Sequence, residues 1–196
     1  VIATKVGGRG KSPDKPNTSR KHILAEVDNS LMRLQTDYID LYQTHYDDGI
    51  TPVEETLSTY QDLIQEGKIR WIGVSNISPE RLRESLEVGE KFNLPKYQTL
   101  QPEYNLYVRE NYETNFEPIA LEHHLSVMNY YSLASGFLTG KYRNEGDLDK
   151  SQRGKDVKKY LDGRGLRILD ALDEISKEYQ TTSAVISLAW LLARTS

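Results

Sequence analysis

Apolar residues along the chain follow two alternating spacings. Short runs rich in β-branched and aromatic residues are each followed by a longer segment in which apolar side chains recur every three or four positions. The first spacing is typical of strands and the second of amphipathic helices. The strand-like runs cover residues 1–6, 39–45, 69–74, 97–104 and 126–133.

The segments between these runs carry helix signals. Ile23, Val27 and Leu31 fall on one side of a predicted helix. A second helix is expected to begin with Thr51 as its N-cap and Pro52 at its first helical position. The predicted helices cover residues 19–34, 51–66, a segment that starts at 78, 112–125, 166–179 and 183–193.

The strand-like runs begin at residues 1, 39, 69, 97 and 126, which gives successive spacings of 38, 30, 28 and 29 residues. A spacing of this size accommodates one strand and one crossover helix. We therefore predict an α/β fold over residues 1–196, organised as one domain with about five parallel strands and outer helices. The sheet could be an open doubly wound sheet or part of an eight-stranded barrel.

Polar side chains stand at the C-terminal end of every predicted strand. They are Lys5, His45, Ser75 with Asn76, Gln101, and Tyr130 with Ser132. An open sheet gathers its chemistry at one switch point, usually beside a glycine-rich turn after the first strand. A barrel brings all its C-terminal strand ends into one ring. The distribution favours the barrel.

Five motifs occur in order along the chain. They are VIATKVG at 1–7, DYIDLYQTH at 37–45, GVSN at 73–76, QPEYN at 101–105 and YYSLASGFLTGK at 130–141. Together they resemble the successive signatures of the aldo-keto reductase family, and the resemblance covers the whole length. It implies a (β/α)8 TIM barrel that is incomplete here, with the first two strands and the last strand absent. It also implies reduction of an aldehyde or ketone by hydride transfer from NADPH, with NAD as the less favoured cofactor.

The resemblance implies catalytic roles for Lys5 and His45. The family uses a tetrad of Asp, Tyr, Lys and His, and its Asp and Tyr would lie before Val1, so none of the 13 tyrosines present is expected to be the acid. A lysine ammonium favours the ionised form of a nearby tyrosine. A histidine at the same mouth can donate to the substrate oxygen. Because the family's Asp and Tyr are missing from residues 1–196, we expect a parent polypeptide of about 300 residues. This length is within the size range of such barrels.

The resemblance also assigns a cofactor site. Ser75, Asn76 and Gln101 would hold the nicotinamide carboxamide, and Tyr130 would stack on the nicotinamide ring. The loop from Ser132 to Lys141 would wrap the pyrophosphate with backbone N–H groups, because its glycines allow close approach. The residues implied in this loop are Ser132, Leu133, Ser135, Gly136 and Lys141.

Residues 142–165 form a long charged stretch after that loop. We predict a long charged loop, too long and too charged for an ordinary connection. Its basic residues are Lys150, Arg153, Lys155, Lys158 and Lys159. They could form an ordinary solvated face or a lid over the cofactor phosphates.

Composition narrows the classes of function. The net charge of −4 argues against a nucleic-acid partner, which normally meets a basic surface. The absence of cysteine excludes disulfides, thiol nucleophiles and cysteine-bound metals, and no metal site is expected. The longest apolar stretch, 185–193, is too short to span a bilayer, so we expect a cytoplasmic protein with a small-molecule carbonyl substrate and no membrane partner.

Two other interpretations stay open. The chain could belong to a cofactor-sensing regulatory subunit that keeps the barrel, turns over slowly and docks on a partner through an exposed apolar patch; no such patch is obvious in the sequence. Alternatively, residues 1–196 could be the whole protein. Its sheet edges would then be open, and it should aggregate or pair with another chain.

Overall fold

The computed structural model describes residues 1–8 and 15–194. The chain divides into two compact units, which are described separately. The first unit comprises Val1–Pro102 and Asn115–Met128, and the second comprises Glu103–Thr114 and Asn129–Ser196.

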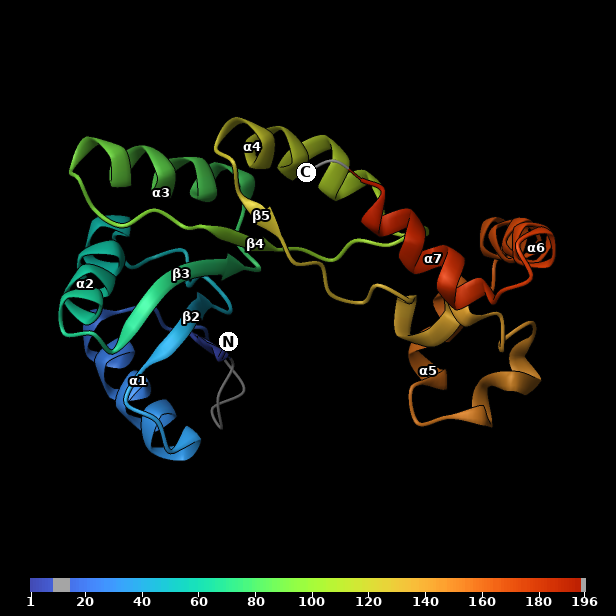
Figure 1. The fold of residues 1–196 in the computed structure, drawn as a ribbon, viewed down its shortest axis with the longest axis horizontal. Coiled ribbons are helices and arrows are strands. Elements are labelled where there is room, and N and C mark those ends of the chain that lie inside the picture. Colours follow the sequence, from blue (N-terminus) through green and yellow to red (C-terminus); the bar gives the residue numbers. More distant parts are fainter. Residues whose placement is uncertain (9–14, 195–196) are drawn as a thin grey trace. The chain divides into compact units, whose positions relative to one another are not determined.

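The first unit contains a parallel sheet whose strands follow their order in the sequence (Figure 1). The strands are β1 (Ala3–Val6), β2 (Ile39–Thr44), β3 (Ile69–Ser75), β4 (Thr99–Gln101) and β5 (Ser126–Val127). Every neighbouring pair is parallel. The prediction of about five parallel strands is confirmed. The last two strands are shorter than predicted, because the chain leaves the sheet after Gln101 and Val127.

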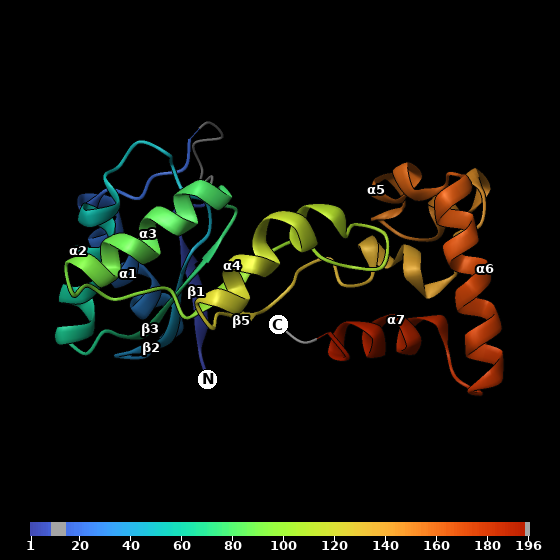
Figure 2. The same cartoon turned by 90° about the horizontal axis from the view of Figure 1, so that it is seen from above.

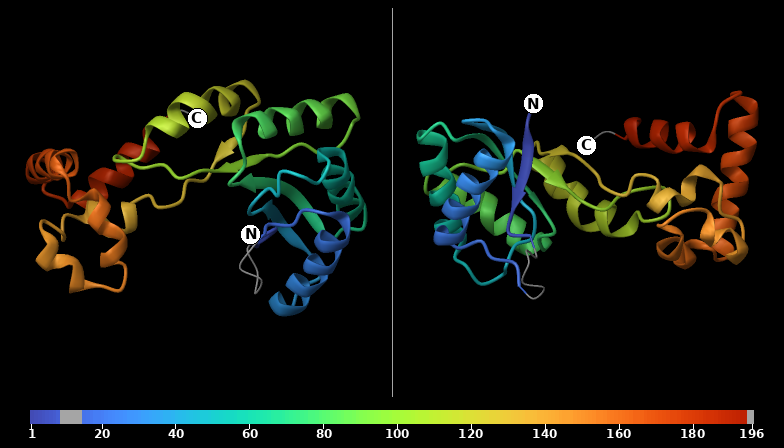
Figure 3. Two further views of the ribbon diagram at one scale, coloured as in Figure 1. Left: turned by 180° about the vertical axis from the view of Figure 1, so that it is seen from behind. Right: turned by 90° about the horizontal axis from the view of Figure 1, so that it is seen from below.

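Helices connect these strands and cover one face of the sheet (Figures 1 and 3). They are α1 (Arg20–Leu34), α2 (Val53–Gln65), α3 (Pro79–Lys91) and, after the short π-helix η1 (Tyr112–Phe116), α4 (Glu117–Glu122). Alternate side chains of the strands, such as Tyr42, Ile72 and Val74, are completely buried beneath this layer. The opposite face of the sheet carries Lys5 and Gln43.

The start of α2 differs from the prediction. Pro52, not Thr51, occupies the N-cap position. The Thr51 hydroxyl instead donates to the Asp48 carboxylate over 2.7 Å, and Asp48 also accepts the main-chain N–H groups of Thr51 and Thr18. The start of α2 therefore has no side-chain cap, and Asp48 fixes the loop before the helix instead, since a carboxylate accepts several donors at once.

The second unit is built from helices around its own core (Figure 2). Its helices are η2 (Ala134–Thr139), η3 (Glu145–Lys150), α5 (Gly154–Val157), η4 (Lys158–Tyr160), α6 (Gly163–Glu178) and α7 (Ser183–Leu192). The stretch 142–165, predicted as a long charged loop, contains the short helices η3, α5 and η4. Val157 and Tyr160 are buried in the core beside Phe137, which holds the segment in place.

Within residues 1–8 and 15–194, no helix is both long enough and apolar enough to cross a membrane.

Candidate active site

One layer of side chains crosses the uncovered face of the first unit's sheet. Lys5 is paired with Gln43, Gln43 with Gly73, and Gly73 with Thr99 in the strand register. Side chains alternate between the two faces of a strand. Tyr42, Thr44 and their register partners point toward the helices. The layer that contains Lys5 therefore points away from the helices.

A second layer lies one step closer to the C-terminal ends of the strands. Ser75 is paired with Gln101. His45 directly follows Thr44, which pairs with Val74, so His45 is level with Ser75. The structure therefore brings Lys5, His45, Ser75 and Gln101 to the same end of the same face. This is the end at which parallel α/β barrels place their active sites.

Hydrogen bonds tie these strand ends together. The Ser75 hydroxyl donates to the main-chain oxygen of Gln101 over 2.7 Å. The Asn76 amide donates to the main-chain oxygen of His45 over 2.8 Å and to the Ser75 hydroxyl over 3.0 Å. Asn76 adopts a positive φ of 40°, which turns the chain back at the end of β3. Asn76 thus joins the four residues above, and these hydrogen bonds cross-link the ends of β2, β3 and β4.

The His45 side chain is partly buried and lies close to a positive charge. Burial lowers the pKa of His45 below its usual value of 6.5, and the Lys5 ammonium lowers it further. A neutral imidazole carries one N–H donor and one acceptor. His45 can therefore donate a hydrogen bond to a carbonyl oxygen near pH 7.

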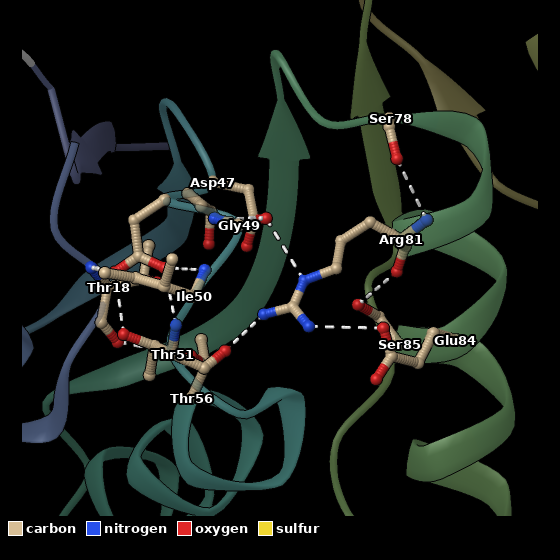
Figure 4. Close-up of polar contacts among 12 residues, drawn as sticks. Thr18, Asp47, Gly49, Ile50, Thr51, Thr56, Ser78, Arg81, Glu84 and Ser85 are labelled. Carbon is tan, nitrogen blue, oxygen red and sulfur yellow. Dashed lines mark hydrogen bonds and ion pairs between the residues drawn. The ribbon is translucent and has the colours of Figure 1, made fainter. Parts of the chain in front are cut away.

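An ion pair fixes the loop that follows His45 (Figure 4). The Arg81 Nε of α3 donates to the Asp47 carboxylate over 3.1 Å, and the same guanidinium binds the main-chain oxygen of Thr51 and the Glu84 carboxylate. Burial raises the pKa of Asp47, and the Arg81 charge opposes that shift. Both side chains, together with Asn76, line a cavity of about 320 Å³. Sequence reasoning missed this pair, because 34 residues separate the partners and no motif contains both.

The second unit contains the predicted pyrophosphate loop, which lines a cavity of about 450 Å³. All five residues implied in the loop line it, namely Ser132, Leu133, Ser135, Gly136 and Lys141. Tyr131, Ser151, Arg153 and Leu188 complete the lining. The sequence indicated Arg153 only as one member of a basic run.

The cations beside the loop suit an anion. Ala134, Ser135 and Gly136 have consecutive positive φ values of 48°, 56° and 93°. The N–H groups of Ala134 and Gly136 donate to the main-chain oxygens of Tyr131 and Leu133, which closes a tight turn beside the cavity. A Cβ on Gly136 would lie 3.6 Å from the Lys141 Nζ, so the ammonium reaches back over this turn. With Arg153 in the same lining, the cavity combines two cations and a tight turn.

Tyr130 precedes this loop. Its ring packs edge-on against Tyr131, with the ring centroids 5.3 Å apart. Its main chain forms a parallel bridge with Glu103 and accepts the N–H of Tyr104. The orientation of Tyr130 is therefore set by its own unit.

The basic run in 142–165 is not one surface. Lys150 pairs with Asp147 over 2.7 Å, and Lys158 pairs with Glu145 over 3.1 Å. Lys159 lies over the ring of Tyr160. Of the five basic residues in the run, Arg153 alone is among the residues that line the cavity.

Comparison with known proteins decides the family. The model of the Aldo/keto reductase family matches residues 1–196. The chain belongs to the aldo-keto reductase family. Glycerol dehydrogenase AKR11B4 from Gluconobacter oxydans superposes on 97% of this chain and 59% of its own, with a TM-score of 0.80 and 31% sequence identity. The predicted α/β barrel class is therefore confirmed.

Curated aldo-keto reductase relatives match over most of the chain. Aldo-keto reductase YhdN of Bacillus subtilis is 38% identical over 90% of this chain and 52% of its own length. L-glyceraldehyde 3-phosphate reductase of Escherichia coli is 32% identical over 98% of this chain and 57% of its own. The protein named Probable voltage-gated potassium channel subunit beta of Arabidopsis thaliana is 34% identical over 97% of this chain and 60% of its own. This aldo-keto reductase chain thus spans between half and three fifths of these relatives.

The strand ends of the first unit carry groups that fit a nicotinamide. Ser75, Asn76 and Gln101 offer the amide and hydroxyl groups that a carboxamide needs, at the end of the sheet where Lys5 and His45 lie. In the second unit, the pair of cations offers what a pyrophosphate needs.

Proposed function

We propose that the protein is an NADPH-dependent aldo-keto reductase that reduces an aldehyde or ketone to the alcohol. The observation that carries the proposal is the gathering of Lys5, His45, Ser75, Asn76 and Gln101 at the C-terminal ends of adjacent parallel strands. When bound, the nicotinamide supplies the hydride.

Lys5 and His45 act on the oxygen of the substrate. Reduction places negative charge on that oxygen until a proton arrives. The neutral His45 N–H donates to the oxygen and orients the carbonyl group. The Lys5 ammonium stabilises the developing charge and favours proton transfer from a neighbouring acid.

The strand-end polar groups orient the nicotinamide. The Gln101 carboxamide has both a donor and an acceptor, which matches the complementary groups of the nicotinamide carboxamide. The Ser75 and Asn76 side chains hold the ends of β2, β3 and β4 in register, so the binding groups are preorganised. Tyr130 supplies the aromatic face for stacking, as the family resemblance implies.

The cavity of the second unit binds the cofactor phosphates. Lys141 and Arg153 supply the positive charge beside the tight turn at residues 134–136. The Arg153 segment acts as a packed wall of this site, because Val157 and Tyr160 anchor it in the core. NADPH is proposed over NADH because the family resemblance of the sequence implies it.

The test uses the intact protein with NADPH and a panel of aldehydes and ketones. The Lys5→Met variant should bind NADPH within about twofold of the parent while turnover falls by about 10² to 10⁴, the usual contribution of acid-base groups. Lys21→Met, which alters an exposed lysine of α1, is the matched control and should behave as the parent. Tyr130→Ala should weaken cofactor binding. Near-normal turnover of Lys5→Met would remove Lys5 from the mechanism.

A cofactor-sensing regulatory subunit is the second candidate. Its support is the 34% identity with the relative named as a voltage-gated potassium channel subunit beta. The two candidates separate in multiple-turnover kinetics. The reductase oxidises bound NADPH repeatedly with a carbonyl substrate, whereas the sensor binds NADPH tightly and turns over slowly with every compound of the panel.

A further inference from the structure

Tyr142 lies directly behind the cavity of the second unit and contacts three of the residues that line it. A Cβ on Gly136 would lie 3.8 Å from the Tyr142 Cε2. The Lys141 Nζ lies 5.0 Å from the centroid of the Tyr142 ring. The Tyr142 and Ser151 hydroxyls share a hydrogen bond, with their oxygens 2.6 Å apart. Tyr142 itself is completely buried and is not one of the lining residues, so it supports the lining from behind.

A second contact ties down the same stretch of chain. The Lys150 Nζ donates to the main-chain oxygen of Lys141 over 3.0 Å, and it also pairs with Asp147. The Asp147 carboxylate in turn accepts the main-chain N–H of Arg143 over 2.7 Å. Residues 150 and 151 are therefore bound to residues 141–143 through hydrogen bonds of their side chains.

The stretch that follows is fixed by packing. A Cβ on Gly154 would overlap the main-chain oxygen of Leu148, so the two backbone segments are in direct contact. Val157 and Tyr160 then enter the core of the unit. Arg153 lies between this packed end and the hydrogen-bonded end at residues 150 and 151.

The two ends differ in how readily they open. An apolar core resists local opening, whereas hydrogen bonds at a partly exposed site can be exchanged for hydrogen bonds to water. The Lys150 side chain is 52% exposed and Ser151 is partly buried, whereas Tyr142 is completely buried. The place of Arg153 beside the cavity therefore depends on the hydrogen-bonded end, and Tyr142 is the fixed partner there.

We propose that Tyr142 is a positioning residue of the phosphate site and that its hydrogen bond with Ser151 is a latch. The latch holds Arg153 beside Lys141, so that both cations face the pyrophosphate of a bound dinucleotide. Opening of the latch releases the Arg153 side of the site and lets the dinucleotide leave. The inference rests on the proposed function, in which this cavity binds the cofactor phosphates. Tyr142 itself contacts neither cofactor nor substrate.

The first test measures NADPH binding to the intact protein by fluorescence titration and stopped-flow dissociation. Tyr142→Phe keeps the ring and removes only the hydroxyl, so the core stays filled. The NADPH Kd should rise about fivefold, as expected for the loss of one hydrogen bond, and mostly through faster dissociation. Ser151→Ala should have the same effect. Ser151→Thr retains a hydroxyl and should bind NADPH within about twofold of the parent.

A double-mutant cycle shows whether the latch acts through Arg153. In the Arg153→Met background, Tyr142→Phe should change the NADPH Kd by less than about twofold, since residues that act as a unit are non-additive. A full fivefold effect in that background would overturn the proposal, as would an unchanged Kd in Tyr142→Phe alone.

Tyr107→Phe is the matched control in the same unit. It also removes a tyrosine hydroxyl that is hydrogen-bonded, in this case to Asp162 over 2.8 Å, and neither Tyr107 nor Asp162 lines the cavity. Tyr107→Phe should leave the NADPH Kd within about twofold of the parent. An equal loss of affinity in the two tyrosine variants would mean that general loosening of the unit causes the effect, and would contradict the latch.

Limited proteolysis with trypsin tests the latch without the cofactor. The rate of cleavage follows the population of the locally opened chain. Cleavage after Lys150 and Arg153, identified by fragment mass, should be about fivefold faster in Tyr142→Phe than in the parent or in Tyr107→Phe. Unchanged cleavage in Tyr142→Phe would overturn the proposal.

The two arms separate this inference from the proposed function. If the parent binds NADPH but Tyr142→Phe binds it equally well, the latch is wrong and the proposed function stands. If the parent does not bind NADPH, the proposed function fails and the latch loses its role in the site with it.

Discussion

The Asn76 side-chain amide donates to the main-chain carbonyl of His45, and the Asp47 N–H returns a hydrogen bond to the Asn76 carbonyl over 3.3 Å. This reciprocal pair joins the end of β2 to the end of β3. One strand end carries the residue assigned to the substrate oxygen, and the other carries a residue assigned to the nicotinamide. The reaction needs these two groups at a fixed separation, and the backbone geometry provides it.

The Asp47–Arg81 ion pair should contribute more to stability than the exposed Arg83–Glu122 ion pair, whose arginine also lies on α3. Its side chains are only 11% and 16% exposed, and removing the guanidinium leaves a carboxylate with little access to water. Arg81→Met should lower the free energy of unfolding by about 2–4 kcal/mol, measured by urea denaturation. The matched control is Arg83→Met, because the Arg83–Glu122 pair is 45% and 60% exposed and should contribute less than about 1 kcal/mol. Equal losses would contradict this account.

The protonation of His45 should depend on Lys5. Burial and the Lys5 charge both lower the pKa of His45, so Lys5→Met should raise that pKa toward 6.5. Titration of the imidazole protons by NMR measures the shift. No change on substitution would mean that the ammonium does not reach His45.

The same pKa shift gives a pH dependence of stability. Because the folded-state pKa of His45 lies below its unfolded value of 6.5, the unfolded state takes up the proton first as the pH falls. Unfolding free energy should therefore decrease as the pH falls through 6.5 toward the folded-state pKa. In His45→Gln this part of the decrease should be absent from urea unfolding curves recorded over that range.

Gly73 should not tolerate a side chain. In Gly73→Ala the new methyl group would lie 2.1 Å from the Thr99 Oγ1, and the resulting overpacking should cost about 1–3 kcal/mol of unfolding free energy. Thr99→Ala removes the atom concerned. The cost of Gly73→Ala should accordingly be smaller in the Thr99→Ala background, and an unchanged cost would show that the crowding arises elsewhere.

The cations of the second-unit cavity should control cofactor affinity. Arg153→Met and Lys141→Met should each weaken NADPH binding by about tenfold, with a smaller dependence on salt than in the parent, because each removes one charge-assisted phosphate contact. Lys158→Met is the control, since Lys158 pairs with Glu145 and does not line the cavity. Fluorescence titration with NADPH at two salt concentrations measures both effects. Equal affinities of the three variants would place the phosphates elsewhere.

Periodicity and strand-end chemistry predicted the sheet well. Each strand-like run contains one strand, and α1, α6 and α7 lie within two or three residues of their predicted bounds, because their burial patterns depend on local spacing. The short β4 and β5 were overestimated, since apolar residues continue past the last strand hydrogen bond. The helices within 142–165 were missed because tertiary burial of Val157 and Tyr160 stabilises segments with a polar sequence.

The motifs identified residues that lie at strand ends, but not the contacts that hold them. Lys5 and His45 stand out as polar groups after apolar runs. Arg81 does not, because its partners come from the loop after β2 and are distant in sequence.

The most direct test of the central claim is a crystal structure of the intact protein with bound NADP⁺. The account predicts the nicotinamide carboxamide within hydrogen-bond distance of Ser75, Asn76 or Gln101, with the reactive ring carbon facing the space beside Lys5 and His45. A nicotinamide bound at another face of the sheet, away from these five side chains, would contradict it.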